Sequence, residues 1–269
     1  MIGSSPALGQ YYPAESPLHR LDARFKLVMV VGFIVALFFI ERSETMVLSL
    51  LILPILLALS RLPARWLWRS LRPLLFILSF TFIIHLFLTP GERLFVLGPV
   101  TATEAGLTRG VFFSLRLVLV ITISSFITLT TTPVALTDAV EALLKPFKRL
   151  GLPVHELALM TTIALRFIPT LLGEAREIIK AQKARGADFE SGHVLKRARG
   201  FVPVLIPLFV GAFRRADDLA SAMEARAYAG GEGRTRLHEA VVVRADYIWL
   251  GTGACLIALM LAVDSLIVM

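Results

Sequence analysis

Two short motifs place an arginine between small residues in nearly the same way: Ala184-Arg185-Gly186 and Ala225-Arg226-Ala227, with the arginines 41 residues apart. A guanidinium is a planar fork of N–H donors that pairs bidentately with a carboxylate, so these side chains suit pockets on an acidic partner. One such motif alone more often marks a helix C-terminus, where arginine complements the helix dipole and glycine takes a left-handed cap. Two copies favour binding of a partner protein.

Helices must position these arginines. The hydrophobic pattern predicts three helices between residues 133 and 246. In chain order they cover residues 133–144, 155–184 and about 194–228. Pro133 opens the first helix behind the capping hydroxyls of residues 130–132. Alanine favours helix over a left-handed cap. We therefore expect the third helix to continue past Ala227 and to end at or just before Gly230, whereas the second ends at Gly186.

The composition is that of an integral membrane protein. Of 269 residues, 56% are hydrophobic and only 18% charged, with a mean hydropathy of +0.75. Soluble domains are about 25% charged, so these values argue against a water-soluble enzyme and against a disordered chain. The net charge of +8 fits basic loops on the cytoplasmic side of a membrane better than nucleic-acid binding. A single cysteine, Cys255, excludes a disulfide framework, and no Cys/His spacing resembles a metal site.

Five stretches are candidates for crossing a membrane, which takes about 20 mostly apolar residues. They are Leu27–Ile40, Met46–Leu59, Leu71–Thr89, Val111–Thr130 and Ile248–Met269. The first two are short, and we expect a tight helical hairpin with the polar residues 41–45 at one surface and Lys26 and Arg61 reaching the other. The loop 90–110 could form a small external hairpin.

Basic residues set the expected orientation of these spans. The segment 133–246 carries 17 Lys and Arg, and four arginines without an acid lie in residues 61–72. The positive-inside rule then places the N-terminus in the cytoplasm and the C-terminus outside. The polar residues 1–24 are expected to be a cytoplasmic arm rather than a signal peptide.

The fold class we expect is an all-α integral membrane protein with about five transmembrane helices and a cytoplasmic domain of about three long helices. Residues 1–132 would hold the N-terminal arm and four spans, residues 133–246 the cytoplasmic domain, and residues 247–269 the last span. The apolar stretches 157–172 and 201–213 compete for assignment as spans. The first contains Arg166 and Pro169, and the second is 13 residues long with two prolines. Such short runs are commoner in buried or interfacial helices, so we expect neither to span.

The sequence resembles the transmembrane T component of energy-coupling factor (ECF) transporters, the EcfT/CbiQ family. The resemblance covers most of the chain and is carried by residues 10–13, 16–22, 151–153, 164–169, 181–187 and 222–226. The two arginine motifs are its specific part. Ala227 departs from the family pattern, which usually has glycine at that position.

This resemblance implies a scaffold and coupling subunit of an ECF-type ABC importer for a vitamin or a metal ion such as cobalt, in the plasma or inner membrane. Its ATPase-binding residues would be Ala184, Arg185, Gly186, Ala225, Arg226 and Ala227, at the tips of two coupling helices. The implied partners are two ABC ATPase subunits, a substrate-binding membrane (S) subunit and membrane lipids, with no nucleic acid. The resemblance implies neither a cofactor nor an enzymatic activity of the chain itself.

Motifs for other functions are absent from the sequence. It has no GxxxxGK[ST] loop for ATP, no HExxH and no GxSxG. His85, Arg116 and Asp264 fall within predicted spans, and isolated ionisable residues there fit either a function or helix-to-helix hydrogen bonds. The alternatives are a stand-alone secondary transporter or channel, which needs repeats or broken helices, and an intramembrane enzyme, which needs an acid/base or metal cluster.

Overall fold

The computed structural model describes residues 11–97, 100–189, 193, 197, 200–230 and 242–268, and the regular secondary structure of that part of the chain is helical apart from one β-hairpin. The chain divides into two compact units. The bundle unit comprises residues 9–140 and 239–269, and the two-helix unit comprises residues 141–238. Helix α8 (Pro133–Leu144) begins in the first unit and ends in the second.

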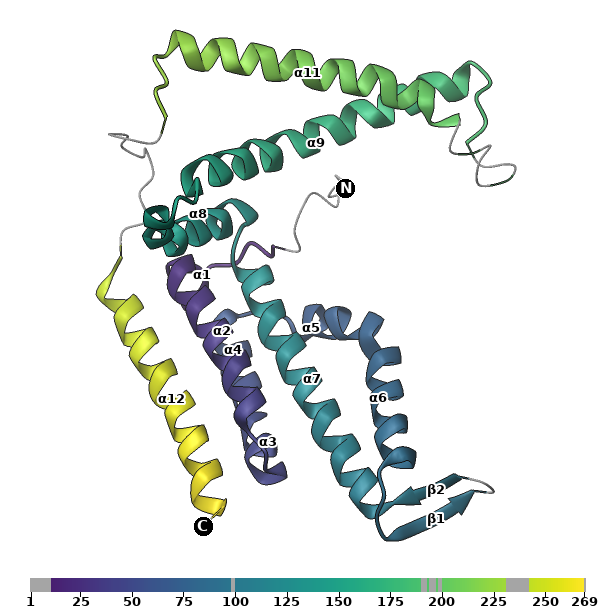
Figure 1. Ribbon diagram of the computed structural model, residues 1–269, viewed down its shortest axis with the longest axis vertical. Coiled ribbons are helices and arrows are strands. Elements are labelled where there is room, and N and C mark those ends of the chain that lie inside the picture. Colours follow the sequence, from purple (N-terminus) through teal and green to yellow (C-terminus); the bar gives the residue numbers. More distant parts are fainter. Residues whose placement is uncertain are drawn as a thin grey trace. The chain divides into compact units, whose positions relative to one another are not determined.

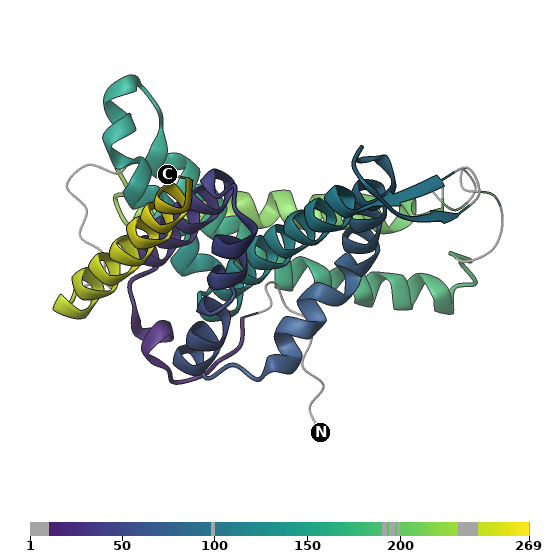
Figure 2. The same cartoon turned by 90° about the horizontal axis from the view of Figure 1, so that it is seen from below.

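Four helices of the bundle unit lie side by side in the order α12, α2, α7, α6 (Figure 1 and Figure 2). Their bounds are Arg244–Val268 for α12, Ala23–Phe39 for α2, Glu104–Thr130 for α7 and Leu75–Leu88 for α6. Helices α3 (Ser43–Ser49) and α4 (Ile52–Ser60) pack against α7. The apolar core between these helices includes Phe33, Leu37, Met46, Leu119, Ile123 and Met260.

The expected helical hairpin is present. Helix α2 leads to a turn at residues 40–42, and α3 and α4 return. Glu41 and Arg42 are exposed at this turn, as predicted, but the rest of the polar segment enters α3, where Thr45 is buried.

The α-helix of the third predicted span, α6, begins at Leu75 rather than at Leu71, and it follows a helix that was not predicted. Helix α5 (Ala64–Leu71) occupies the expected arginine-rich loop, and a 3-10 helix, η1 (Arg72–Leu74), leads into α6. Pro73 lacks an N–H and disfavours a continuous α-helix there. The predicted hairpin in residues 90–110 is formed by the antiparallel strands β1 (Arg93–Leu97) and β2 (Val100–Thr103).

Two glycines of α7 allow α6 to approach closely. A Cβ atom on Gly106 would lie 2.5 Å from the carbonyl oxygen of Leu86, and one on Gly110 would lie 3.1 Å from that of Phe82. Glycines four residues apart form the GxxxG pattern that packs helices backbone to backbone in membranes. No larger residue fits at Gly106 without separating the two helices.

Within the described residues, five helical stretches are long and apolar enough to cross a membrane, which is the predicted number. Four of them overlap the second to fifth predicted spans: residues 43–60, 64–88, 104–130 and 244–266. The fifth is α9 (Val154–Ala184), which we expected to lie outside the membrane. Helix α2, the first predicted span, has 17 residues and so measures about 25 Å, within the range of spanning helices.

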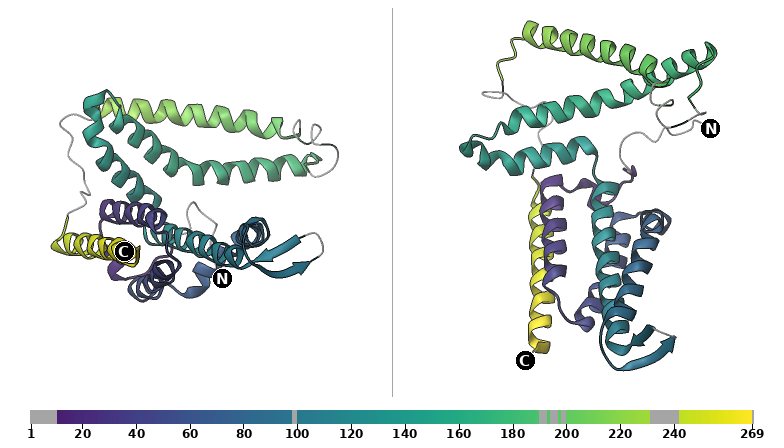
Figure 3. Two further views of the ribbon diagram at one scale, coloured as in Figure 1. Left: turned by 60° about the horizontal axis from the view of Figure 1, so that its bottom comes forward. Right: turned by 45° about the vertical axis from the view of Figure 1, so that its right-hand side comes forward.

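In the two-helix unit, α9 and α11 (Val202–Ala225) pack against each other and run antiparallel (Figure 1 and Figure 3). Helix α9 matches its predicted range within one residue, although Pro169 lies inside it. Helix α8 has the predicted bounds, and the N–H of Ala135 donates to Oγ1 of Thr132 at its start (3.3 Å). Residues 194–196, 198 and 199 of the third predicted helix lie outside the described part of the chain.

Candidate partner-binding site

Both arginine motifs form helix C-termini. Arg185 is the C-cap residue of α9, and Arg226 is that of α11. The motif residues are all exposed: Ala184, Arg185, Gly186, Ala225, Arg226 and Ala227. Among the described residues, neither arginine forms an ion pair with the rest of the chain. Both guanidinium groups can therefore meet a carboxylate on another protein.

The backbone turns in the same way at both ends, which overturns the expected extension of the third helix. Helix α11 ends at Ala225, and Ala227 has a φ of 54°, comparable with 87° at Gly186. At each end, the second N–H beyond the C-cap donates 3.0 Å to a carbonyl of the last turn: Ala187 to Gln182, and Tyr228 to Met223. This is the Schellman motif, and both helices end in it.

A tertiary contact of Tyr228 explains why the helix stops at an alanine. The Tyr228 hydroxyl lies 3.4 Å from Nε2 of His155 at the start of α9, and Nδ1 of the same ring lies 3.2 Å from Glu141. Continuing α11 would turn Tyr228 away from His155. A left-handed φ costs a non-glycine residue about 1–2 kcal/mol, which this contact and the Schellman bonds offset. The prediction that the helix persists to Gly230 is therefore wrong.

An ion pair joins the two helices between their ends. Nη2 of Arg215 in α11 lies 2.7 Å from Oε2 of Glu174 in α9. Gly211 leaves room for the Glu174 carboxylate here, because a Cβ atom on it would lie 3.1 Å from Oε1 of Glu174. Each cap arginine lies 11 residues beyond this pair (185 − 174 and 226 − 215), or about 16 Å along its helix. The two tips lie at opposite ends of the antiparallel pair (Figure 1).

In the bundle unit, two of the charged residues within the predicted spans cap helix ends. Asp264 of α12 accepts hydrogen bonds from the N–H groups of Glu41 (3.3 Å) and Arg42 (3.2 Å), where α3 begins. Arg116 of α7 donates to the carbonyl of Ile40, the C-cap of α2. A carboxylate at a helix N-terminus and a cation at a C-terminus complement the helix dipoles. These contacts favour helix-to-helix hydrogen bonding over a transport function for Arg116 and Asp264.

His85, the third of these residues, makes a contact within its own helix. Its Nδ1 lies 2.9 Å from the carbonyl oxygen of Thr81, one turn earlier in α6. The ring centroid lies 4.6 Å from that of Phe113 in α7. His85 thus contributes to the packing of α6 against α7.

Charged residues cap helices at the other end of the bundle as well. Asp246 of α12 accepts from the N–H of Asp22 (3.0 Å), the N-cap of α2. Lys26 of α2 donates to the carbonyl of Thr130 (3.1 Å) and to Oγ1 of Thr131 (3.3 Å), where α7 ends. Lys26 is buried rather than reaching the surface as expected. Four charged side chains thus hold α2, α3, α7 and α12 in register.

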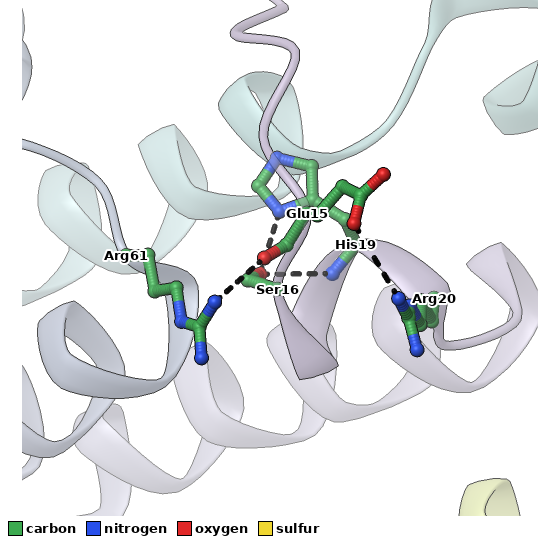
Figure 4. Close-up of polar contacts among 5 residues, drawn as sticks. All are labelled: Glu15, Ser16, His19, Arg20 and Arg61. Atoms are coloured by element: carbon green, nitrogen blue, oxygen red, sulfur yellow. Dashed lines mark hydrogen bonds and ion pairs between the residues drawn. The ribbon is translucent and has the colours of Figure 1, made fainter.

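The N-terminal arm is fixed by polar contacts around His19 (Figure 4). Its Nε2 lies 3.0 Å from the carbonyl of Tyr12, which can only accept, so Nε2 carries the proton and Nδ1 accepts from the hydroxyl of Ser16 (2.6 Å). Burial lowers the pKa of His19 below its ordinary value, which favours this neutral tautomer. Arg61, at the end of α4, donates to the carbonyl of Glu15 (3.4 Å).

Together these features define a multi-pass membrane protein with a bundle of apolar helices and a helix pair that ends in two exposed arginines. The chain belongs to the CbiQ family of cobalt transport proteins, whose family model matches residues 14–237. Its curated relatives include proteins named energy-coupling factor transporter transmembrane protein EcfT. The family resemblance seen in the sequence is thereby confirmed, and the chain is the transmembrane component of an ECF transporter.

These relatives match the chain over nearly its whole length. The EcfT of Acidaminococcus fermentans is 51% identical over 252 residues, which cover 94% of this chain and 93% of the relative. The EcfT of Thermosediminibacter oceani is 50% identical over 239 residues, covering 89% and 90%. The EcfT of Bacillus subtilis is 45% identical over 264 residues, covering 98% and 97%.

Proposed function

We propose that this chain couples two ABC ATPase subunits to a separate substrate-binding S subunit, for uptake of a vitamin or a metal ion. The observation that carries the proposal is the pair of matching helix caps that expose Arg185 and Arg226. Each tip would enter a groove of one ATPase subunit, where the guanidinium pairs with a carboxylate. The small flanking residues leave room for that approach. The energy would come from the ATPases and not from this chain.

The two long helices would act as levers. Nucleotide-driven closure of the ATPases would displace the tips, and the Glu174–Arg215 pair would carry that displacement from one helix to the other. Coupling of this kind requires the tips to bind the two ATPase states with different affinity. A rigid α-helix transmits the displacement along its length.

The N-terminal half of α11 supports a second docking surface. Its apolar side chains Leu205, Ile206, Phe209, Val210 and Phe213 are all more than 40% exposed. Contiguous exposed apolar surface marks contact with a membrane or with an apolar protein face. We place the S subunit against this half of α11, which leaves the polar half to the ATPases.

Co-purification tests the proposed function. A tagged chain expressed with the ATPase and S subunits encoded by the same organism should retain both kinds of subunit in detergent. A stand-alone transporter or channel would purify without them and would support uptake by itself. Retention of no ATPase by the folded chain would contradict the proposal.

The orientation of the chain is also part of the proposal. We place the two-helix unit in the cytoplasm, α2 rather than α9 across the membrane, and the β-hairpin outside. In a Cys255→Ala background, cysteines introduced at the exposed Glu177 and Asp218 should resist an impermeant thiol reagent in intact cells and react after permeabilisation. A cysteine at Glu92, beside the hairpin, is the matched control and should react in intact cells. Labelling at Glu177 from outside would show that this orientation is wrong.

A further inference from the structure

Three arginines form one face of α5 and its C-cap. Arg65, Arg69 and Arg72 are spaced four and three residues apart, which places them on the same side of the helix, and all three are exposed. None of them forms an ion pair among the described residues. The sequence offers them no local partner either, because no Asp or Glu lies between Glu44 and Glu92.

The opposite face of α5 fixes the helix to the bundle. Leu67 is buried in a cluster with Leu62, Phe126 and Leu129, so α5 is held against the end of α7. Trp66 lies beside this cluster, with its ring centroid 5.6 Å from that of Tyr12 and 5.7 Å from the guanidinium carbon of Arg69. The arginine face is therefore presented by an anchored helix and not by a free loop.

Apolar surface follows the arginines directly. Helix α5 lies across the end of α6, as Figure 1 and Figure 3 show. At the start of α6, Phe76 is 78% exposed and stacks on Phe80, which is 55% exposed. Trp68 on α5 is 58% exposed. Tryptophan at a junction of basic and apolar surface is typical of the membrane–water interface.

We infer that Arg65, Arg69 and Arg72 bind the phosphate groups of anionic phospholipids, whose acyl chains lie along Phe76 and Phe80. The positive charge of the three arginines is complementary to such headgroups. The arginines and the two phenylalanines lie next to each other, as the polar headgroup and the apolar chains of a lipid do. The site goes beyond the proposed coupling function, and neither proposal depends on the other. It would anchor one end of the bundle to an anionic membrane surface.

Tryptophan fluorescence tests the site with the full-length chain. In a Trp249→Phe background only Trp66 and Trp68 remain, both on α5. The protein is reconstituted in vesicles of equal parts phosphatidylglycerol and phosphatidylcholine, with brominated chains on one lipid or on the other. Brominated phosphatidylglycerol should quench the two tryptophans more strongly. Because each arginine near an anionic surface contributes about fivefold to affinity, Arg65→Gln with Arg72→Gln should remove most of this preference.

Arg93→Gln with Arg109→Gln is the matched control, because it removes the same charge from exposed positions on β1 and α7 and should retain the preference. Arg65→Lys with Arg72→Lys should retain it too. Inorganic phosphate added in excess separates the two possible ligands. If the site binds lipids, brominated phosphatidylglycerol remains the stronger quencher in the presence of phosphate. Complete loss of that difference would show a free-phosphate site and overturn the inference. Equal quenching by both lipids, or an equal loss in the control, would also overturn it.

Discussion

Replacing both Arg185 and Arg226 by glutamate should prevent the chain from retaining ATPase subunits. The two guanidinium groups are exposed and unpaired within the described chain, so the substitutions disturb no internal ion pair. Removing one partner of a buried interfacial charge pair costs about 2–5 kcal/mol, and charge reversal adds repulsion. That range corresponds to roughly 30- to 5,000-fold in binding for each site. Each single variant should keep one ATPase contact and lose only part of the yield.

The measurement is the amount of ATPase that co-purifies with the tagged chain at equal chain recovery. Lys180→Glu with Arg214→Glu is the matched control, because both side chains are exposed on the same two helices and the change in charge is the same. The control should retain the ATPases. Wild-type retention by the Arg185→Glu/Arg226→Glu chain would exclude the proposed site.

Asp264→Leu should destabilise the bundle strongly. The carboxylate accepts two backbone N–H groups at the α2–α3 turn, and an apolar replacement leaves both without a partner. Each unsatisfied group costs about 1–3 kcal/mol, so a loss of roughly 2–6 kcal/mol is expected. The thermal midpoint of the purified chain in detergent, followed by tryptophan fluorescence, measures this loss.

Two further variants separate the capping role from a transport role. Ser265→Leu adds the same apolar residue at the neighbouring exposed position and should leave the midpoint nearly unchanged. Asp264→Asn keeps one acceptor and should lose less stability while supporting uptake by the assembled transporter. A stable Asp264→Asn chain that assembles but does not support uptake would contradict a purely structural role.

The helix ends that were predicted correctly are those set by a single residue type at the end itself. Pro133 and the preceding threonine gave the start of α8, and Gly186 gave the end of α9, because each residue fixes a backbone conformation by itself. The same local reasoning failed at Ala227, where Tyr228 and His155, 73 residues apart in the chain, hold the turn. Helix propensity cannot anticipate such a contact.

Elements that depend on packing were the hardest to predict. Helix α5 is eight residues long, and it is held by the burial of Leu67 against α7. The spacing of Arg65, Arg69 and Arg72 puts them on one helical face opposite Leu67, a signal that the expectation of a loop did not use. The close approach of α6 and α7 could have been predicted from the sequence, because Gly106 and Gly110 have the GxxxG spacing of tightly packed helices. In the candidate site, the motifs indicated both arginines, but the ion pair between Glu174 and Arg215 is visible only once α9 and α11 are folded together.

Arg185 and Arg226 lie at the same distance along their helices from the Glu174–Arg215 ion pair, and this equal spacing bears on the symmetry of a partner. For two straight antiparallel helices in contact at Glu174 and Arg215, a rotation by 180° about an axis through the contact exchanges the helices and brings Arg185 to the position of Arg226. A pair of similar ATPase subunits related by their own twofold axis presents two like grooves on either side. A single chain can thus offer a symmetric partner two matching ends, provided that the two axes coincide.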